Sequence, residues 1–375
     1  MVQEVYRRDR FNEIKNLVNS IGPGSIFLVR GNRSYEDSGA SAFVEELLGT
    51  SRIDSFRDFK TNPQSDDLAS GVSRFREGTY ELILAIGGGS VLDMAKLISM
   101  FVHQEAKTES IIRGKTQPAD TKTPVLAVPT TAGTGAEATK FAVVYLDQKK
   151  HSFEHPLILP DYVYLSPVFL HSSDPYLSAC AGLDAFSQAV ESVWSVNSTD
   201  ESESIALDAI ELIWKNLRKA APGGDEIAME NMLEASHLSG RAINITRTTA
   251  PHALSYAFTS YYGIPHGHAV ALTLPFFLEY NYHVTGKNCT DKRGYQSVKA
   301  RIDKILGLLG CGIGEVRDLL GEFFRSIGID TDIRSLAEGF DPEIIINNVN
   351  TERLSNNPRL IEKNDLRTLF HIQHK

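Results

Sequence analysis

The sequence predicts a Rossmann-like, dinucleotide-binding α/β domain followed by an all-α domain. Three observations support this prediction. Buried-strand candidates alternate with helices in the first half of the chain, two of those strands end in glycine-rich loops, and the second half shows almost only helical spacing. Because 375 residues exceed what one hydrophobic core usually organises, two domains are expected.

The first domain is expected to contain short apolar strands that end at turn residues. Five segments show the pattern: strands at 25–30 (SIFLVR), 81–86 (ELILAI) and 124–129 (PVLAVP), and helices at 39–49 and 91–104. Strands that alternate with helices predict an open, mainly parallel sheet covered on both faces. Ligands of such sheets lie beyond the carboxyl ends of the strands, where both glycine-rich loops are expected.

Apolar residues recur every three or four positions from Tyr176 onward, which predicts helices. The spacing is clearest in four segments, at 177–195, 203–220, 226–243 and 298–310. Before them, LSPVFLHSSDP at 165–175 carries two prolines and several turn formers, as a domain boundary does. We therefore expect an α/β domain at 1–168 and a helical domain at 169–375.

Composition excludes several classes of protein. With 42% hydrophobic and 23% charged residues, the chain is an ordinary folded protein, and its net charge of −9 disfavours binding to nucleic acid. The three cysteines are far apart and offer neither a disulfide framework nor a CxxC metal site, which suits a reducing cytoplasm. The charged N-terminus and the lack of ~18 consecutive apolar residues predict a cytoplasmic protein without a membrane span.

Two glycine-rich loops are candidates for a phosphate-binding site. The first is Gly87-Gly88-Gly89-Ser90, where glycines let the backbone approach a pyrophosphate and the helix start presents free N–H groups. Its spacing matches neither GxGxxG nor a P-loop, so a plain tight turn remains an alternative for this loop alone. The second, at 129–137 (PTTAGTGAE), adds the hydroxyls of Thr130, Thr131 and Thr134. Two such loops in one sheet favour a phosphate-bearing ligand.

Asp184, Gln188, His252 and His266 form a candidate metal site. Asp184 and Gln188 are four residues apart and share one face of the predicted helix. An aspartate in an apolar helix needs a cation, a metal or a hydrogen-bond donor. The histidines are fourteen residues apart and meet only if the chain turns near Gly263. A single histidine is more often structural, but one carboxylate with two imidazoles suits a divalent first-row metal.

Four sequence motifs together resemble those of the iron-containing (group III) alcohol dehydrogenases, and the resemblance extends over nearly the whole chain. They are GGGSxxDxAK at 87–96, PTTAGTGAE at 129–137, GLDA at 182–185 and PHG at 265–267. The resemblance implies a dehydroquinate synthase-like architecture, in which metal and substrate lie in the cleft between the two domains. It also implies reversible hydride transfer between NAD(P)H and a small aldehyde or primary alcohol, and a homodimer.

The resemblance assigns Asp184, His252 and His266 as ligands of Fe²⁺ or Zn²⁺, with both histidines in the catalytic site. Gln188 is included as a fourth ligand, although many members carry a histidine there and an amide oxygen binds these metals more weakly. Tyr256 stands where many members carry a histidine that assists proton transfer. Tyr256 is therefore a candidate proton donor, or simply an aromatic wall of the site.

Cofactor contacts are expected from the two loops and their neighbours: Gly31, Asn62, Gly87, Gly88, Gly89, Ser90, Asp93, Thr130, Thr131, Thr134 and Lys150. Asp93 can equally be a helix-capping residue. Members that prefer NAD often have an aspartate after the first strand, where this chain has Gly31 beside Arg30 and Arg33. We therefore expect NADPH to be accepted.

The stretch at 244–252 (NITRTTAPH) resembles the phosphonoacetaldehyde reductase branch of the family. Arg247 or Arg241 is then expected to pair with the phosphonate, because a guanidinium fork suits a tetrahedral oxyanion. Three alternatives remain at this point: a metal-independent reductase of the same fold, a dehydroquinate synthase-like lyase, and a nucleotide sensor without catalysis.

Overall fold

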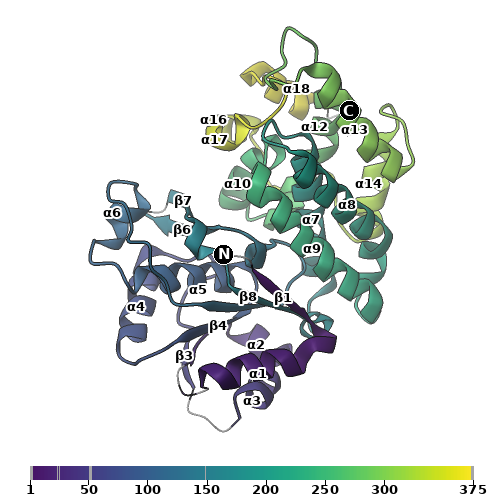
Figure 1. The fold of residues 1–375 in the computed structure, drawn as a ribbon. Coiled ribbons are helices and arrows are strands. Elements are labelled where there is room, and N and C mark those ends of the chain that lie inside the picture. Colours follow the sequence, from purple (N-terminus) through teal and green to yellow (C-terminus); the bar gives the residue numbers. More distant parts are fainter. Residues whose placement is uncertain (1–2, 23, 25, 50–52, 148, 373–375) are drawn as a thin grey trace. The chain divides into compact units, whose positions relative to one another are not determined.

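The computed structural model describes residues 3–22, 24, 26–49, 53–147 and 149–372. The chain forms two compact units, Met1–Ser173 and Asp174–Lys375. The first is an α/β unit and the second a helical unit (Figure 1). The predicted fold class is therefore confirmed.

Six strands form the central sheet of the α/β unit, and all its pairings are parallel. In spatial order the strands are β1 (Glu4–Arg7), β8 (Tyr162–Leu165), β5 (Val125–Pro129), β4 (Leu82–Gly87), β2 (Ile26–Arg30) and β3 (Asp54–Phe56). The strands expected at 25–30, 81–86 and 124–129 are β2, β4 and β5. Ser25, the expected first residue of β2, lies outside the described residues. The sequence analysis did not identify β1, β3 and β8.

Helices cover both faces of this sheet, and each face has its own hydrophobic core. They are α1 (Phe11–Ile21), α2 (Arg33–Asp37), α3 (Ala40–Leu48), α4 (Ser65–Arg76), α5 (Gly89–Phe101) and α6 (Thr108–Ile112). Along β2, Phe27 lies in the core that contains residues of α4 and α5, whereas Ile26 and Leu28 lie in the core that contains residues of α1 and α3. Because alternate side chains face opposite cores, the central strands β2, β4 and β5 are nearly continuous apolar runs.

An antiparallel hairpin, β6 (Phe141–Leu146) and β7 (Lys149–Glu154), lies outside the main sheet and was not predicted. Its buried residues Ala142, Val144 and Leu146 alternate along β6 and join the core beside α5. Asp93 on α5 accepts a hydrogen bond from the Val143 N–H at 2.9 Å, which fastens the hairpin to that helix.

The second unit is helical throughout its named elements, as predicted. Its helices are α7 (Pro175–Trp194), α8 (Asp200–Ala220), α9 (Glu226–Thr246), α10 (Ala250–Tyr262), α11 (His266–Ala271), α12 (Leu274–Tyr282), α13 (Tyr295–Leu309), α14 (Val316–Ser326), α15 (Ile333–Leu336), α16 (Pro342–Asn347), α17 (Thr351–Leu354) and α18 (Lys363–Ile372). Asp174 caps α7, since its carboxylate accepts from the N–H groups of Tyr176 and Leu177 at 2.9 and 3.1 Å.

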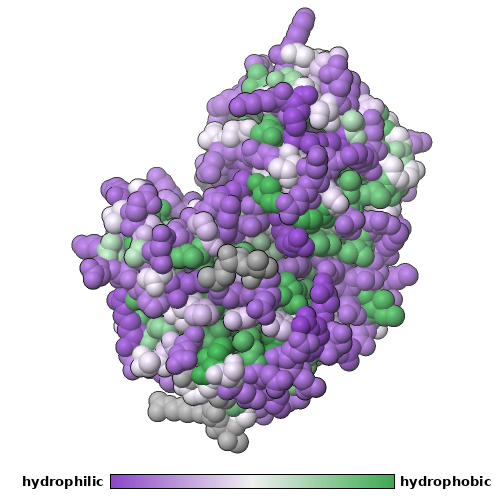
Figure 2. Space-filling view, viewed as in Figure 1, coloured by the Kyte–Doolittle hydropathy of each residue, from purple (hydrophilic) through white to green (hydrophobic). Residues whose placement is uncertain are grey.

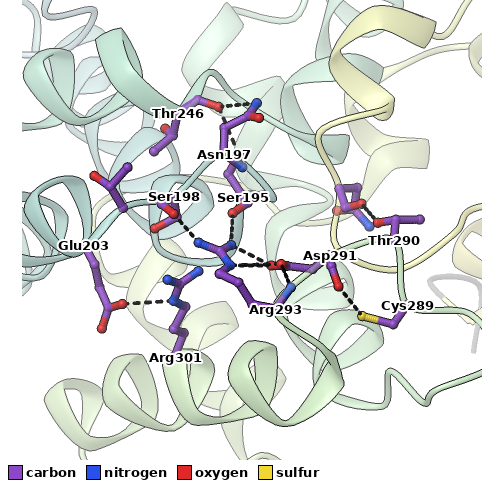
Figure 3. A network of polar contacts seen from close by, with 12 residues as sticks. Ser195, Asn197, Ser198, Glu203, Thr246, Cys289, Thr290, Asp291, Arg293 and Arg301 are labelled. Carbon is purple, nitrogen blue, oxygen red and sulfur yellow. Dashed lines mark hydrogen bonds and ion pairs between the residues drawn. The ribbon is translucent and has the colours of Figure 1, made fainter.

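A polar network joins the carboxyl ends of α7 and α9 (Figure 3). Arg293 pairs with Asp291 and donates to the Ser195 carbonyl at 2.8 Å, just after α7 ends. The Ser195 hydroxyl and the Asn197 amide both donate to the carbonyl of Thr246, at 3.0 and 3.2 Å. The last residue of α9 is therefore fixed by partners about 50 positions away.

Hydrophilic residues dominate the face of the protein visible in Figure 2. Among the described helices, none combines the length and apolarity that crossing a membrane requires.

Candidate functional site

One face of α7 carries three buried polar side chains, Asp184, Gln188 and Glu191. Their spacing of four and three residues places them on successive turns. Asp184 is 4% exposed and Glu191 is fully buried. Buried carboxylates are costly unless they are paired, so this face demands cationic or hydrogen-bonding partners.

His252, on the first turns of α10, lies between the two carboxylates. Its Nε2 atom is 3.2 Å from Asp184 Oδ1, and its Nδ1 atom contacts Glu191 Oε1. The other Glu191 oxygen accepts from the N–H and the hydroxyl of Thr249, at 2.5 and 2.8 Å. Glu191 therefore holds the proton on Nδ1 and turns Nε2 toward Asp184.

The contact between His252 Nε2 and Asp184 Oδ1 requires a proton or a metal ion. With Nδ1 protonated, the neutral ring presents a lone pair to a carboxylate oxygen, and two acceptors at this separation need a proton or a metal between them. Burial lowers the pKa of His252, but Glu191 and Asp184 outweigh it and raise this pKa to about 10. Burial also raises the pKa of Asp184, but hydrogen bonding to His252 and the charge of His266 lower it overall.

His266 reaches the same place through two glycines. Gly263, with φ +69°, ends α10 in a left-handed conformation and reverses the chain. Gly267 lets α11 approach the backbone of α7, because a Cβ there would lie 1.9 Å from the Cys180 carbonyl oxygen. As a result, His266 Nε2 is 3.9 Å from Asp184 Oδ1 and the two imidazole rings are 5.4 Å apart.

These three residues fit a divalent metal. Asp184, His252 and His266 each offer one ligand atom, and the atoms lie within 4.8 Å of one another. One carboxylate and two imidazoles are ligands that iron(II) and zinc accept, and Glu191 supplies the outer hydrogen bond that orients a metal-binding histidine. Gln188 hydrogen-bonds to the Asp184 carboxylate, so its amide supports a ligand residue.

Tyr256 and His268, which are near these three residues in the sequence, have different surroundings. The ring of Tyr256 stacks on His266, with centroids 5.8 Å apart and planes only 4° from parallel. His268 is instead bonded to the Tyr176 hydroxyl at 2.9 Å and to the Asp330 carbonyl at 2.6 Å. Tyr256 therefore borders the three-residue cluster, whereas His268 joins α11 to other parts of the unit.

In the α/β unit, the two glycine-rich loops meet at the carboxyl ends of β4 and β5. The Thr130 N–H donates to the Gly87 carbonyl at 3.1 Å. A Cβ on Gly89 would lie 2.9 Å from Thr134, so the loops are in close contact. Ser90 donates to the carbonyl of Thr61, which brings the turn containing Asn62 to the same edge. Thr131 also borders this edge, since a Cβ on Gly88 would lie 3.5 Å from it.

Asp93 lies on α5 against the hairpin, and Lys150 lies on the hairpin strand β7. Asp93 accepts from the Val143 N–H and from Lys96, the latter at 3.5 Å, so it does not cap α5. Lys96 is fully buried and also donates to the Ala136 carbonyl and the Thr139 hydroxyl, at 2.9 and 3.0 Å. Burial raises the pKa of Asp93 and lowers that of Lys96. Lys150 is exposed on β7.

Gly31 follows β2 beside a guanidinium group. Arg30 lies over the ring of Tyr35, 4.4 Å from its centroid, and donates to the Gly31 carbonyl at 3.2 Å. A Cβ on Gly31 would lie 2.4 Å from the Ser34 hydroxyl. The end of β2 therefore has no carboxylate at position 31, and the Arg30 guanidinium there lies 3.7 Å from the Glu36 carboxylate.

Arg247 has an unusual backbone conformation directly after α9. Its φ of 63° and ψ of 167° fall in a region that is essentially restricted to glycine and costs other residues about 1–3 kcal/mol. The Arg247 N–H donates to the Ile243 carbonyl at 2.9 Å, and the Thr246 hydroxyl oxygen lies 3.0 Å from the Arg247 carbonyl oxygen. Its guanidinium is half-buried, whereas that of Arg241 is exposed.

Comparison with known proteins identifies the family. Residues 3–167 match the iron-containing alcohol dehydrogenase family, and residues 178–373 match its C-terminal domain. The chain belongs to the iron-containing alcohol dehydrogenases. A phosphonoacetaldehyde reductase from Streptomyces viridochromogenes is 33% identical over 323 residues, covering 81% of this chain and 79% of the relative.

Two further relatives match almost the entire chain. An NADPH-dependent butanol dehydrogenase from Clostridium saccharobutylicum is 26% identical and covers 97% of this chain and 94% of its own. The crystal structure of a sulfoacetaldehyde reductase from Bifidobacterium kashiwanohense with NAD⁺ is 27% identical, with a TM-score of 0.83, and covers 99% of this chain and 96% of its own.

As an iron-containing alcohol dehydrogenase, the chain is an NAD(P)-dependent oxidoreductase that acts on CH–OH groups with a divalent metal of the iron type. The predicted family, fold and reaction class are thus confirmed. The sequence analysis missed Glu191. This residue is seven positions after Asp184 on the same helix face, and that spacing could have found it.

Proposed function

We propose that this enzyme reduces a small aldehyde that carries a tetrahedral anionic group, with a divalent metal held by Asp184, His252 and His266. The observation that carries the proposal is the convergence of one ligand atom from each of these residues within 4.8 Å. When bound, the metal supplies Lewis acidity to the substrate oxygen during hydride transfer from the nicotinamide.

The protein groups around that oxygen orient ligands and handle protons. Glu191 keeps the Nδ1 proton of His252 in place, so Nε2 stays available as a ligand. Gln188 supports Asp184 through its amide. The Tyr256 hydroxyl, on a ring stacked against His266, is our candidate proton donor to the developing alkoxide.

The cofactor is proposed to bind over the two glycine-rich loops and the turn at Asn62. The backbone N–H groups at the start of α5 and the hydroxyls of Ser90, Thr130, Thr131 and Thr134 suit a pyrophosphate. Asp93 contributes by holding the hairpin, because its oxygens already have partners there, and Lys150 remains a predicted contact.

NADPH is the proposed preferred cofactor. Gly31 places no carboxylate against a 2′-phosphate, and the Arg30 guanidinium lies at the Gly31 carbonyl. Measuring kcat/KM with both cofactors tests this preference. A tenfold advantage for NADH contradicts it.

The anionic substrate class is supported by Arg247 and by the relatives. Phosphonoacetaldehyde and sulfoacetaldehyde, named in two of the relatives, both combine an aldehyde with a tetrahedral oxyanion. The half-buried guanidinium of Arg247 lies five residues before His252, on the segment that joins α9 to α10.

The family resemblance also leads us to propose a homodimer, which sedimentation analysis would test.

The decisive experiment combines metal analysis with activity. The enzyme is purified anaerobically without chelator, and its metal content is compared with NADPH oxidation on phosphonoacetaldehyde and propanal before and after chelation. We expect about one metal per chain and turnover that is lost on chelation and restored by Fe²⁺ or Zn²⁺. Metal-free protein with full turnover contradicts the proposed role of Asp184, His252 and His266 and favours a metal-independent reductase.

A further inference from the structure

We infer that Arg353, on α17, joins Arg247 in a single anion subsite beside His252, which binds the phosphonate or sulfonate group of the substrate. This inference rests on the proposed reduction of an anionic aldehyde and names the residues that select it. It also assigns a role to α17, a short helix more than 100 positions away from Arg247 in the chain.

Two hydrogen bonds hold α17 against the segment that carries Arg247 and His252. The Asn350 N–H, just before α17, donates to the Ala253 carbonyl at 3.1 Å. The Asn356 side chain, just after it, donates to the Thr248 carbonyl at 3.0 Å. The two carbonyls flank His252 along the chain, so Arg353 projects from a turn that is attached on both sides of this histidine.

The backbone of Arg353 is fixed by a helix cap, and the residue is largely removed from solvent. Its backbone N–H donates to the Asn350 side chain at 2.9 Å, which caps the first turn of α17. The residue is only 9% exposed. A long cationic side chain is rarely buried to this extent unless it is paired, so the position of this guanidinium is fixed by its surroundings.

The two guanidinium groups share one electrostatic environment. Burial, followed by the charge of Arg353, lowers the pKa of Arg247, while Glu352 opposes this effect. A guanidinium does not give up its proton in a protein, so Arg247 and Arg353 both stay charged, with the Glu352 carboxylate as a nearby counter-charge. A tetrahedral anion can accept hydrogen bonds from both guanidinium groups.

The backbone at Arg247 gives independent support. A glycine would relieve the conformation at φ 63°, yet the chain has an arginine there and holds it through the bonds to Thr246 and the network in Figure 3. Strain that is maintained by the surrounding structure is characteristic of functional positions. The strained residue is also the one that places a cation near His252.

The subsite suits a tetrahedral oxyanion. Three terminal oxygens can accept hydrogen bonds from two planar guanidinium forks, which a carboxylate or a neutral alkyl chain cannot match. A phosphonate carries up to two negative charges and a sulfonate carries one. We therefore expect the loss of either arginine to affect phosphonoacetaldehyde more than sulfoacetaldehyde.

The test compares Arg353→Gln, Arg353→Lys and Arg247→Gln in the metal-loaded enzyme. Arg334→Gln is the control, because Arg334 is an exposed arginine of the same unit and its loss changes the net charge equally. Steady-state kinetics are measured with phosphonoacetaldehyde, sulfoacetaldehyde and propanal. Calorimetric titration with methylphosphonate gives a readout that is independent of turnover.

For Arg353→Gln we expect KM for phosphonoacetaldehyde to rise by about 10- to 100-fold, the scale of a lost charge-assisted hydrogen bond, with methylphosphonate binding weakened in parallel. KM for propanal should rise at least tenfold less. Arg353→Lys, which keeps the charge and loses the fork, should fall between Arg353→Gln and the wild type. It also keeps the test valid if Arg353→Gln does not fold.

The outcomes separate this inference from the proposed function. If the wild type prefers phosphonoacetaldehyde and Arg247→Gln loses that preference while both Arg353 variants keep it, the shared subsite is wrong and the substrate class stands. If Arg353→Gln raises KM for propanal and phosphonoacetaldehyde by the same factor, Arg353 has only a structural role and the inference is overturned. If the wild type neither prefers anionic aldehydes nor binds methylphosphonate, the substrate class itself is wrong.

Discussion

Replacing Arg247 by glycine and by alanine separates backbone strain from the loss of the side chain. Both variants remove the guanidinium and its contacts. Only glycine adopts φ 63° and ψ 167° without strain, because alanine keeps the Cβ atom that makes this conformation unfavourable. We therefore expect Arg247→Gly to be more stable than Arg247→Ala, which reverses the usual order of these two residues.

The expected difference follows from two opposing terms. Relief of strain at such a position is worth about 1–3 kcal/mol. Glycine also makes the unfolded chain more flexible, which costs about 0.4–1 kcal/mol of stability relative to alanine. Taking the middle of each range, Arg247→Gly should exceed Arg247→Ala by roughly 1.3 kcal/mol in free energy of unfolding.

Urea unfolding followed by tryptophan fluorescence measures this difference in the right part of the chain. The protein's 2 tryptophans, Trp194 and Trp214, lie on α7 and α8, so their emission reports on the helical unit. With a slope of roughly 2 kcal/mol/M, the midpoint for Arg247→Gly should lie about 0.6 M above that for Arg247→Ala. Metal-free protein is used throughout, so that metal binding does not shift the midpoints.

The control pair is Glu230→Gly and Glu230→Ala, at an exposed position within α9. There alanine should be the more stable residue by about 0.5–1 kcal/mol, the ordinary helix preference. If Arg247→Ala is at least as stable as Arg247→Gly, the backbone at position 247 is not strained, and the reasoning from its conformation fails.

Three further predictions follow from the sites. Glu191→Gln should weaken metal binding by about 10- to 100-fold, because an amide holds the Nδ1 proton of His252 less well; unchanged affinity in a competition titration with a chromogenic chelator would count against this orienting role. Gly31→Asp should raise the ratio of kcat/KM for NADH to that for NADPH by about tenfold or more, and a constant ratio would show that position 31 does not contact the ribose. Burial raises the pKa of the Cys180 thiol to about 11, so at pH 8 iodoacetamide should label Cys180 far more slowly than Cys289. The labelling rate of Cys180 should rise up to about pH 11. Equal labelling of the two cysteines at pH 8, measured by mass spectrometry, contradicts this.

Much of the α/β unit was predictable because its pattern is local. Strands buried on both faces read as uninterrupted apolar runs, and the loop at Gly87–Ser90 lies between such a strand and a helix of regular spacing. The hairpin β6–β7 was missed because its alternating burial depends on packing against α5. The short edge strands β1 and β3 were missed because they hold only 4 and 3 residues.

Periodicity and motifs are properties of neighbouring residues, so they were enough to predict the fold class, the family, the helix face that carries Asp184 and Gln188, and the candidate histidines. The contact of Glu191 with His252, and the position of α17 against the segment containing Arg247, became apparent only from the folded chain. These contacts join positions 61 and more than 100 residues apart, and they depend on buried hydrogen bonds that no local pattern specifies.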